Sequence, residues 1–388
     1  SRFDDAIREY EAALQLSPDD KEILNSLAVD YTRTGQYDLA IDTFEHIEQC
    51  DPGFEPCYCN RIITYTEMGL HDHAEQMFYL AQQIAPDCAL CYYNVGNSLF
   101  VRQQYAKAVR CWLRTAELEP THPQINYRIA QAYWSEGDMD RSREHFLAEL
   151  RENPGDLDVI LDFGLFLLEQ GRIESAKEKF NRILELDPDF APAMFYLGEI
   201  ALDAGNRDEA IELFSQAIGK DGKLLGPSFR LAQCALSRDD TEQARNHLIA
   251  ELKRCPELPD ALVSMASMLI RVDEPNYATH CLLRALDLDS SNADANYYLG
   301  VISAAQNMFE DARRFFTRAL DIDPKHTGSL KELAELYLGT NRLEKASQKA
   351  REARDLNPDD PDARDLDRRI RIARIRQRIT GCLTRFRR

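Results

Sequence analysis

The sequence predicts an all-α solenoid of tandem helical hairpins, and three observations predict it. The stretch 157–190 contains two amphipathic helical segments separated by a glycine. Proline recurs at steps of 34 residues along almost the whole chain. Small, bulky and turn-forming residues recur in the same register as the prolines. A fixed period of this length is typical of repeats that each contact only their neighbours, and therefore of a solenoid rather than a globule.

Each element of the 157–190 unit has a local cause. The first helix is predicted at about 158–170, and Gly171 follows it because glycine adopts positive φ at no steric cost. The second helix is predicted at about 173–186. Asp187 and Pro188 end it, since proline has no N–H with which to continue the helical hydrogen bonds.

The prolines set the register of the whole chain. Only Gly222 and Ser290 interrupt the 34-residue series that passes through Pro188, and both are turn-forming residues. The other members of the series are Pro18, Pro52, Pro86, Pro120, Pro154, Pro256, Pro324 and Pro358. At the 219–227 junction proline is lost and three glycines appear, which is consistent with either harmless drift in a turn or a looser stack.

Four further columns agree with this register when Leu157 is counted as position 1. Positions 8 and 20 hold Gly or Ala except at Ile62 and Ser142, as expected where two helices cross about 8–10 Å apart. Position 15 holds Gly in five repeats and Asp or Asn in four, the residues that best tolerate a left-handed turn. Position 24 is bulky, with Phe44, Phe78, Trp112, Phe146, Phe180, Phe214, Leu248, Leu282 and Phe316.

These columns resemble the tetratricopeptide repeat, a helix–turn–helix of 34 residues, over nearly the whole chain. The resemblance implies a right-handed superhelical solenoid whose first helices line a concave groove. It divides the chain into the second helix of a truncated repeat (1–20), ten tandem repeats (21–360), and a capping helix with an Arg-rich tail (361–388). Ser1 falls inside a turn of the pattern, so we expect an N-terminal segment to precede it.

The resemblance also predicts where a partner binds. In this family positions 2, 5, 6, 9, 12 and 13 of each first helix face the groove, which suits an extended peptide or a helix of another protein. Aromatic and amide residues are frequent at these positions here, and amides both donate to and accept from a peptide backbone. The predicted principal patch is Asn60, Tyr93, Asn94, Asn97, Tyr127, Arg128 and Gln131, and the second patch is Phe195, Phe229 and Arg230.

Two interpretations of the principal patch remain open. It partly resembles the carboxylate clamp of chaperone-binding tetratricopeptide domains, in which Asn, Lys and Arg hold a C-terminal carboxylate. The lysines of that clamp are replaced here by Tyr or Cys and by Gln, so chaperone C-termini are not the expected ligand. Alternatively, Tyr93, Asn94 and Asn97 are simply residues that an average repeat of the family carries.

The sequence predicts a non-enzyme without a cofactor or a small-molecule substrate. It contains no Ser-His-Asp or Cys-His arrangement, no Gly-rich phosphate loop and no paired carboxylate motif. Five cysteines, however, lie near one junction between repeats. Buried free thiols are their expected state, no metal is predicted, and a zinc site or a disulfide is the alternative. These residues are Cys50, Cys57, Cys59, Cys88 and Cys91.

The charge distribution is uneven. The net charge is −19, and the last 21 residues carry nine Arg and no acidic residue, which leaves −28 on residues 1–367. An acidic body argues against a nucleic-acid duplex lying along it and favours basic or neutral partners. The Arg-rich end either caps the last repeat, folds back on the acidic body, or binds an anionic partner such as lipid, nucleic acid or an acidic protein.

These observations predict a non-catalytic scaffold that binds an extended peptide or helix of a partner in its concave groove. No apolar run approaches the roughly 18 residues of a transmembrane segment, and a cytoplasmic location is expected. Two alternatives remain: the substrate-recognition arm of a larger enzyme, such as a glycosyltransferase, and an adaptor tethered to an anionic surface by the Arg-rich tail.

Overall fold

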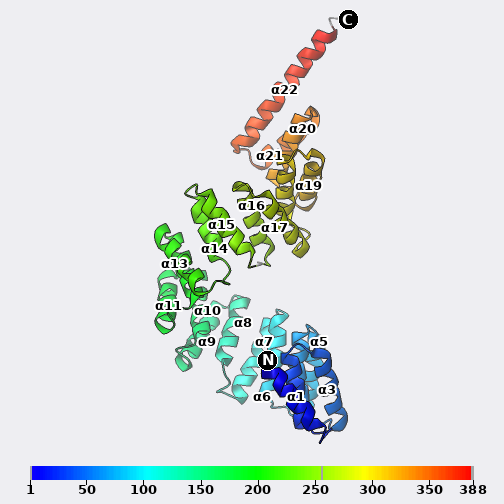
Figure 1. The fold of residues 1–388 in the computed structure, drawn as a ribbon, viewed down its shortest axis with the longest axis vertical. Helices are drawn as coiled ribbons and strands as arrows, with labels where there is room; N and C mark the ends of the chain where they lie inside the picture. The colour runs from blue at the N-terminus through cyan, green and yellow to red at the C-terminus, as the bar shows by residue number, and fades with distance from the viewer. Residues whose placement is uncertain (1, 255–256, 386–388) are drawn as a thin grey trace. The chain divides into compact units, whose positions relative to one another are not determined.

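The computed structural model describes residues 2–254 and 257–385, so Pro256 of the proline series and the last three residues of the predicted tail lie outside the described residues. The described residues form 22 α-helices and no β-strand, which confirms the all-α prediction (Figure 1). The helices fall into two compact units, Ser1–Pro188 and Asp189–Arg388, which we call unit 1 and unit 2.

The helices of unit 1 are α1 (Arg2–Leu14), α2 (Lys21–Arg33), α3 (Tyr37–Cys50), α4 (Glu55–Glu67), α5 (His71–Ile84), α6 (Ala89–Val101), α7 (Tyr105–Leu118), α8 (Ile125–Glu136), α9 (Met139–Glu152), α10 (Leu157–Glu169) and α11 (Ile173–Leu186). Those of unit 2 are α12 (Ala191–Asp203), α13 (Arg207–Lys220), α14 (Pro227–Leu236), α15 (Thr241–Leu252), α16 (Pro259–Arg271), α17 (Pro275–Leu288), α18 (Ala293–Ala305), α19 (Phe309–Ile322), α20 (Thr327–Gly339), α21 (Leu343–Leu356) and α22 (Pro361–Arg385).

From α2 to α21 the helices pack as successive antiparallel pairs, each even-numbered helix against the odd-numbered one that follows it. The predicted turn residues have the expected backbone. Gly171 has φ of 69°, and Asp239, Asp273, Asn307 and Asn341 have φ between 57° and 61°. Gln103 occupies the same turn position in its repeat, also with positive φ (59°), although its side chain gives no sequence signal for that conformation.

The small residue at position 8 makes room for the bulky residue at position 24 of the same hairpin. A Cβ placed on Gly164 would lie 2.5 Å from Cε1 of Phe180, and Phe180 is fully buried. The same contact recurs between Gly198 and Phe214. The predicted close approach of the two helices is therefore made by a ring packed directly against a helix backbone.

We expect Gly164→Ala to destabilise unit 1 by about 1–3 kcal/mol, because the new methyl group collides with a ring that is enclosed on all sides. This cost outweighs the roughly 1 kcal/mol that alanine gains over glycine in a helix. Urea unfolding followed by circular dichroism measures the change. Gly219→Ala is the matched control: it lies in α13 with no atom near the added Cβ, and it should leave stability unchanged or raise it.

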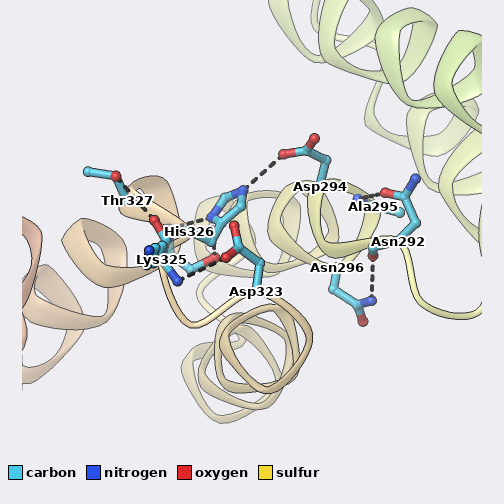
Figure 2. Close-up of polar contacts among 9 residues, drawn as sticks. Asn292, Asp294, Ala295, Asn296, Asp323, Lys325, His326 and Thr327 are labelled. Atoms are coloured by element: carbon cyan, nitrogen blue, oxygen red, sulfur yellow. Dashed lines mark hydrogen bonds and ion pairs between the residues drawn. The ribbon is translucent and has the colours of Figure 1, made fainter. Parts of the chain in front are cut away.

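Side chains at the helix N-termini also connect successive repeats. Asn292 caps α18 by accepting the N–H of Ala295 at 2.8 Å, and His326 caps α20 by accepting the N–H of Ser329 at its Nδ1, at 3.0 Å (Figure 2). Because Nδ1 accepts, Nε2 carries the hydrogen and donates to Asp294, at the start of α18, at 2.9 Å. The two first helices are therefore linked through one imidazole.

Helix α22 packs on α21 and α20. Leu366 and Ile370 are buried against Ala346 and Ala350 of α21. The helix extends to Arg385, beyond the predicted end near 379. The partition of the chain at residues 20 and 360, and the capping role of this helix, stay predictions.

Several arginines of the predicted tail are paired with acidic residues. Arg369 donates to both carboxylate oxygens of Glu335 on α20, and Arg374 pairs with Glu344 on α21. Arg371 pairs with the buried Asp367 within α22 itself. The pairs of Arg369 and Arg374 connect the basic end of the chain to the helices that precede it.

Among the described residues, no helix is both long enough and apolar enough to span a membrane.

Candidate peptide-binding site

The principal patch lies in unit 1, on the first helices α4, α6 and α8, and part of it forms a hydrogen-bonded network. The hydroxyl of Tyr127 donates to Oδ2 of Asp162 at 2.7 Å, and Nε2 of Gln131 donates to the same oxygen at 2.9 Å. Arg128 donates from Nη1 to Oε1 of Gln131 at 3.3 Å. Burial and the hydrogen bond to Asp162 both raise the pKa of Tyr127 above its ordinary value, so its hydroxyl stays a donor.

A cavity of about 300 Å³ opens between α4, α6 and α8. It brings together three residues of the predicted patch, Asn94, Asn97 and Arg128. The rest of the lining is mainly apolar, apart from the hydroxyl of Thr66 and the carboxylate of Glu67 on α4. The apolar residues are Ile63, Phe100, Val101 and Trp112. The arrangement is that of many ligand sites, in which apolar walls supply area and a few polar groups fix orientation.

The Arg128 guanidinium is incompletely satisfied. Its Nε is buried and has no hydrogen-bond partner, whereas Nη1 is occupied by Gln131. A buried donor without an acceptor costs about 1–3 kcal/mol, so an acceptor that entered the cavity and reached Nε would recover that cost. A backbone carbonyl or a carboxylate is such an acceptor.

Three members of the predicted patch are held by contacts within the protein. Asn60 donates to Oδ1 of Asn25 at 3.0 Å on the preceding first helix, outside the cavity lining. The Tyr93 ring packs on His122, with 4.3 Å between ring centroids. Asn94 is 4% exposed and its Nδ2 donates to the backbone oxygen of Cys59 at 3.2 Å, so it holds α6 to α4 as well as lining the cavity.

The second patch lies in unit 2 and is mostly engaged by the protein itself. The Phe195 ring packs on Phe214 with 5.7 Å between centroids, and a Cβ on Gly226 would lie 2.9 Å from it. Phe229 packs against the buried cluster of α14 to α18. Arg230 pairs with Glu199 and donates to Gln233 at 3.0 Å. The second patch therefore offers fewer free groups than the first.

The predicted principal patch did not include Asp162, Thr66 or Phe100, although the first belongs to the hydrogen-bonded network and the other two line the cavity. Asp162 occupies position 6 of its repeat, and Thr66 and Phe100 occupy position 12 of theirs, so all three stand at positions that face the groove in this family. The signal was present in the register, but the predicted patch was drawn from positions 5, 6 and 9, and it left out position 12 and the carboxylate at position 6.

The five clustered cysteines separate into distinct environments. Cys59, Cys88 and Cys91 converge with Glu55. Cys57 faces the other way and donates to the backbone oxygen of Phe44 at 3.3 Å, and burial raises its pKa to about 12. Cys50 is exposed on α3 beside His46 and Asp19.

The helix pairs, their glycine–aromatic crossings and their turn residues define an αα-hairpin repeat protein. Family models described as "Tetratricopeptide repeat" match residues 1–53, 161–223 and 274–327, and residues 201–253 and 303–370. A model described as "YpiA-like, C-terminal tetratricopeptide repeats" matches residues 123–189. The chain belongs to the tetratricopeptide repeat family.

The chain is also similar to individual proteins. It is 33% identical over 72 residues to the human "Protein O-mannosyl-transferase TMTC3", a match that covers 18% of this chain and 8% of that protein. The chain therefore spans less than a tenth of the length of that relative.

Among the solved structures that resemble it over most of its length at low identity are the following two. One is a monomeric mutant of IFIT1 with m7Gppp-AAAA (16% identity, 91% of this chain and 90% of that chain, TM-score 0.51). The other is yeast Tom70 (14% identity, 97% of this chain and 93% of that chain, TM-score 0.45). Likeness at these identities shows the fold alone.

Proposed function

We propose that this chain is a non-catalytic scaffold that binds an extended peptide or a helix of a partner protein along the first helices of unit 1. The observation that carries the proposal is the cavity between α4, α6 and α8, whose lining includes Asn97 and Arg128, and the Nε of Arg128 has no hydrogen-bond partner. Its apolar walls suit a hydrophobic side chain of the partner, and its polar groups suit the adjoining backbone.

The partner contact can be described more closely from these groups. Arg128 and the two amides supply several donors, whereas Glu67 and the amide oxygens supply acceptors. A peptide segment that presents a carbonyl or carboxylate to Arg128 and an apolar side chain to Phe100 and Trp112 satisfies both halves of the lining. Arg and aromatic residues are also the types that most often dominate binding energy at protein interfaces.

We expect the double substitution Asn97→Ala/Arg128→Ala to abolish recovery of the main partner in affinity capture, and to weaken the isolated complex by about 2 kcal/mol or more in titration calorimetry. Asn97 is a better target than Asn94, because the Asn94 amide also donates to the backbone oxygen of Cys59 and its loss would disturb the packing of α6 on α4. Arg110→Ala, at an exposed position on α7, is the matched control and should leave binding unchanged. Equal recovery from the parent and the double variant would remove this cavity as the binding site.

A second candidate function is the recognition arm of a larger enzyme, and the partial match to an O-mannosyl-transferase favours it. In that case the array would bind the acceptor protein while a separate domain performed the transfer. Sequencing the complete open reading frame tests the idea, because it requires a catalytic domain in the same polypeptide.

Tethering to an anionic surface is less well supported. Arg369, Arg371 and Arg374 are each already paired with a carboxylate of the chain. An external anionic surface would therefore have to displace these pairs.

A further inference from the structure

Four potential metal ligands from two successive repeats converge at the junction of α4 and α6. The ligand atoms of Glu55, Cys59, Cys88 and Cys91 all lie within 4.8 Å of one another. Glu55 and Cys59 lie about one turn apart on α4, Cys88 is the N-cap of α6, and Cys91 lies in its first turn. Cys59 and Cys91 are each only 1% exposed, whereas Glu55 and Cys88 are half-buried.

The contacts within this cluster point its donor atoms inward. Sγ of Cys91 lies 2.8 Å from Oε1 of Glu55. Sγ of Cys88 accepts the backbone N–H of Cys91 at 3.2 Å, and Sγ of Cys59 accepts Nδ2 of Asn94 at 3.5 Å. N–H groups directed at ligand atoms from outside are what hold thiolates in place around a metal ion.

The geometry fits a tetrahedral ion. With Zn–S bonds of about 2.3 Å and Zn–O bonds of about 2.0–2.2 Å, neighbouring ligand atoms in such a site lie roughly 3.5–3.8 Å apart. The four atoms here are already gathered to within 4.8 Å, so small rotations of the side chains complete the site. Binding would replace the contact between Cys91 and Glu55 by two bonds to the same ion.

The cluster would match the charge of a zinc ion once it binds. The three thiols would release their protons on binding, and three thiolates with one carboxylate carry the same charge as the four thiolates of a common structural zinc site. The buried guanidinium nearest in the chain, Arg61, is paired with Glu45 and Glu48 at 2.9 Å each. Its charge is therefore already matched by those two carboxylates.

We propose that Glu55, Cys59, Cys88 and Cys91 bind one Zn²⁺ ion in a closed, four-coordinate structural site that ties α4 to α6. The site lies beneath the candidate peptide cavity, because Asn94 contacts Cys59 and also lines that cavity. The ion would add a second link between two neighbouring first helices, which are already joined by the hydrogen bond from Asn94 to Cys59.

The test uses the full chain, purified without oxygen in the presence of a thiol reductant and supplied with Zn²⁺. We expect one zinc per chain by elemental analysis after gel filtration, and a melting temperature that falls on treatment with a chelator and recovers when zinc is returned. Co²⁺ in place of Zn²⁺ should give a sulfur-to-cobalt charge-transfer band and the intense visible bands of a tetrahedral site. Both measurements are made on the unaltered protein, so they do not depend on a variant that folds.

Variants then assign the ligands. Cys88→Ser should lower the intensity of the charge-transfer band by about one third, since one of three thiolates is lost, and should weaken zinc retention. Glu55→Gln should weaken zinc retention while leaving the charge-transfer band in place. Cys57→Ser is the matched control, because its thiol lies on the same helix but faces Phe44, and it should retain one zinc.

The same experiment tests whether the second group of potential metal ligands, Asp19, His46 and Cys50, binds the ion instead. Cys50→Ser should keep the full zinc content. Each of the following would overturn the proposal: a reduced chain that stays free of zinc, a disulfide between any two of the three clustered cysteines under these conditions, or zinc loss in Cys50→Ser or Cys57→Ser as large as in Cys88→Ser.

Discussion

Replacing Arg254 with alanine is expected to destabilise unit 2 by about 3–5 kcal/mol, because it leaves a buried carboxylate without its cation. Glu251 is 3% exposed and pairs with Arg254 at 3.2 Å. Arg254 also donates to the backbone oxygen of Gly222 at 2.7 Å and to Oγ of Ser228 at 2.9 Å. A single guanidinium therefore holds together the junction that leads from α13 to α14.

The loss of stability caused by Arg254→Ala should grow as the pH rises. Burial raises the pKa of Glu251 above its ordinary 4.5, while the N–H of Gly226 and the charge of Arg254 oppose that shift. Without Arg254 the folded-state pKa rises further, so the folded chain holds a proton that the unfolded chain has lost. Stability is then retained below about pH 4.5 and is lost as the pH rises from there through the folded-state pKa.

Urea unfolding at two pH values, one near 5 and one near 8, measures both effects. Arg238→Ala is the matched control: its partner Asp208 is exposed, and such pairs contribute about 0–1 kcal/mol. A loss in Arg254→Ala no greater than that in Arg238→Ala would show that the junction does not depend on this contact.

This junction also shows why part of the fold escaped prediction. The missing proline and the three glycines of 219–227 were consistent with a harmless turn or a loose stack, and the local sequence could not choose between them. The residues that hold the junction, Glu251 and Arg254, come from the end of α15 and its C-terminal flank, about 25–32 residues later. Only the packing of the following helix brings them together.

A signal for this arrangement existed in the repeat register. Position 27 is Ala, Ile or Thr in every complete repeat except two, where it is Glu149 and Glu251. Both are buried, and each accepts a backbone N–H at the start of the preceding first helix, from Tyr127 and Gly226 respectively. Those helices, α8 and α14, have 12 and 10 residues, whereas the other first helices from α2 to α20 have 13.

Both helices begin two residues later in the repeat than the other first helices, and the N–H groups of their first turns have no partner within the helix. A glutamate from the second helix reaches them in place of an N-cap side chain. An acidic residue at a repeat position that otherwise holds small or apolar residues therefore predicts a buried hydrogen-bond acceptor.

The candidate site was predictable to the same degree. Register alone placed Asn97 and Arg128 on the groove side of α6 and α8, and the cavity lies there. Register could not show that Asn94 turns toward Cys59 or that Glu199 neutralises Arg230, because both contacts depend on side chains of another repeat. The cysteine cluster was predictable in part, because the sequence placed Cys59, Cys88 and Cys91 near one junction, but it did not show that Glu55 joins them or that Cys57 turns toward Phe44.

The second large effect is expected for Phe146→Ala, which should destabilise unit 1 by about 3–5 kcal/mol. Phe146 is fully buried, and its ring contacts four other aromatic rings of α8 and α10. The distances between centroids are 5.4 Å to Phe163, 5.5 Å to Phe166, 6.2 Å to Trp134 and 6.3 Å to Tyr127. Truncation leaves a cavity that three rigid helices cannot readily close.

In a repeat array each hairpin is stabilised mainly by its neighbours, so the loss should be local. We expect hydrogen exchange to accelerate in α8, α9 and α10 and to change little in α2 and α3. Arg143→Ala, at an exposed position on the same helix α9, is the control and should leave exchange unaltered.

The same substitution connects packing to binding. Tyr127 rests on Phe146 and donates to Asp162, and Asp162 in turn accepts from Gln131, the partner of Arg128. If that network positions Arg128, Phe146→Ala weakens partner binding without touching the cavity, and Arg143→Ala does not. Unchanged affinity in a folded Phe146→Ala chain would show instead that Arg128 is positioned by α8 alone.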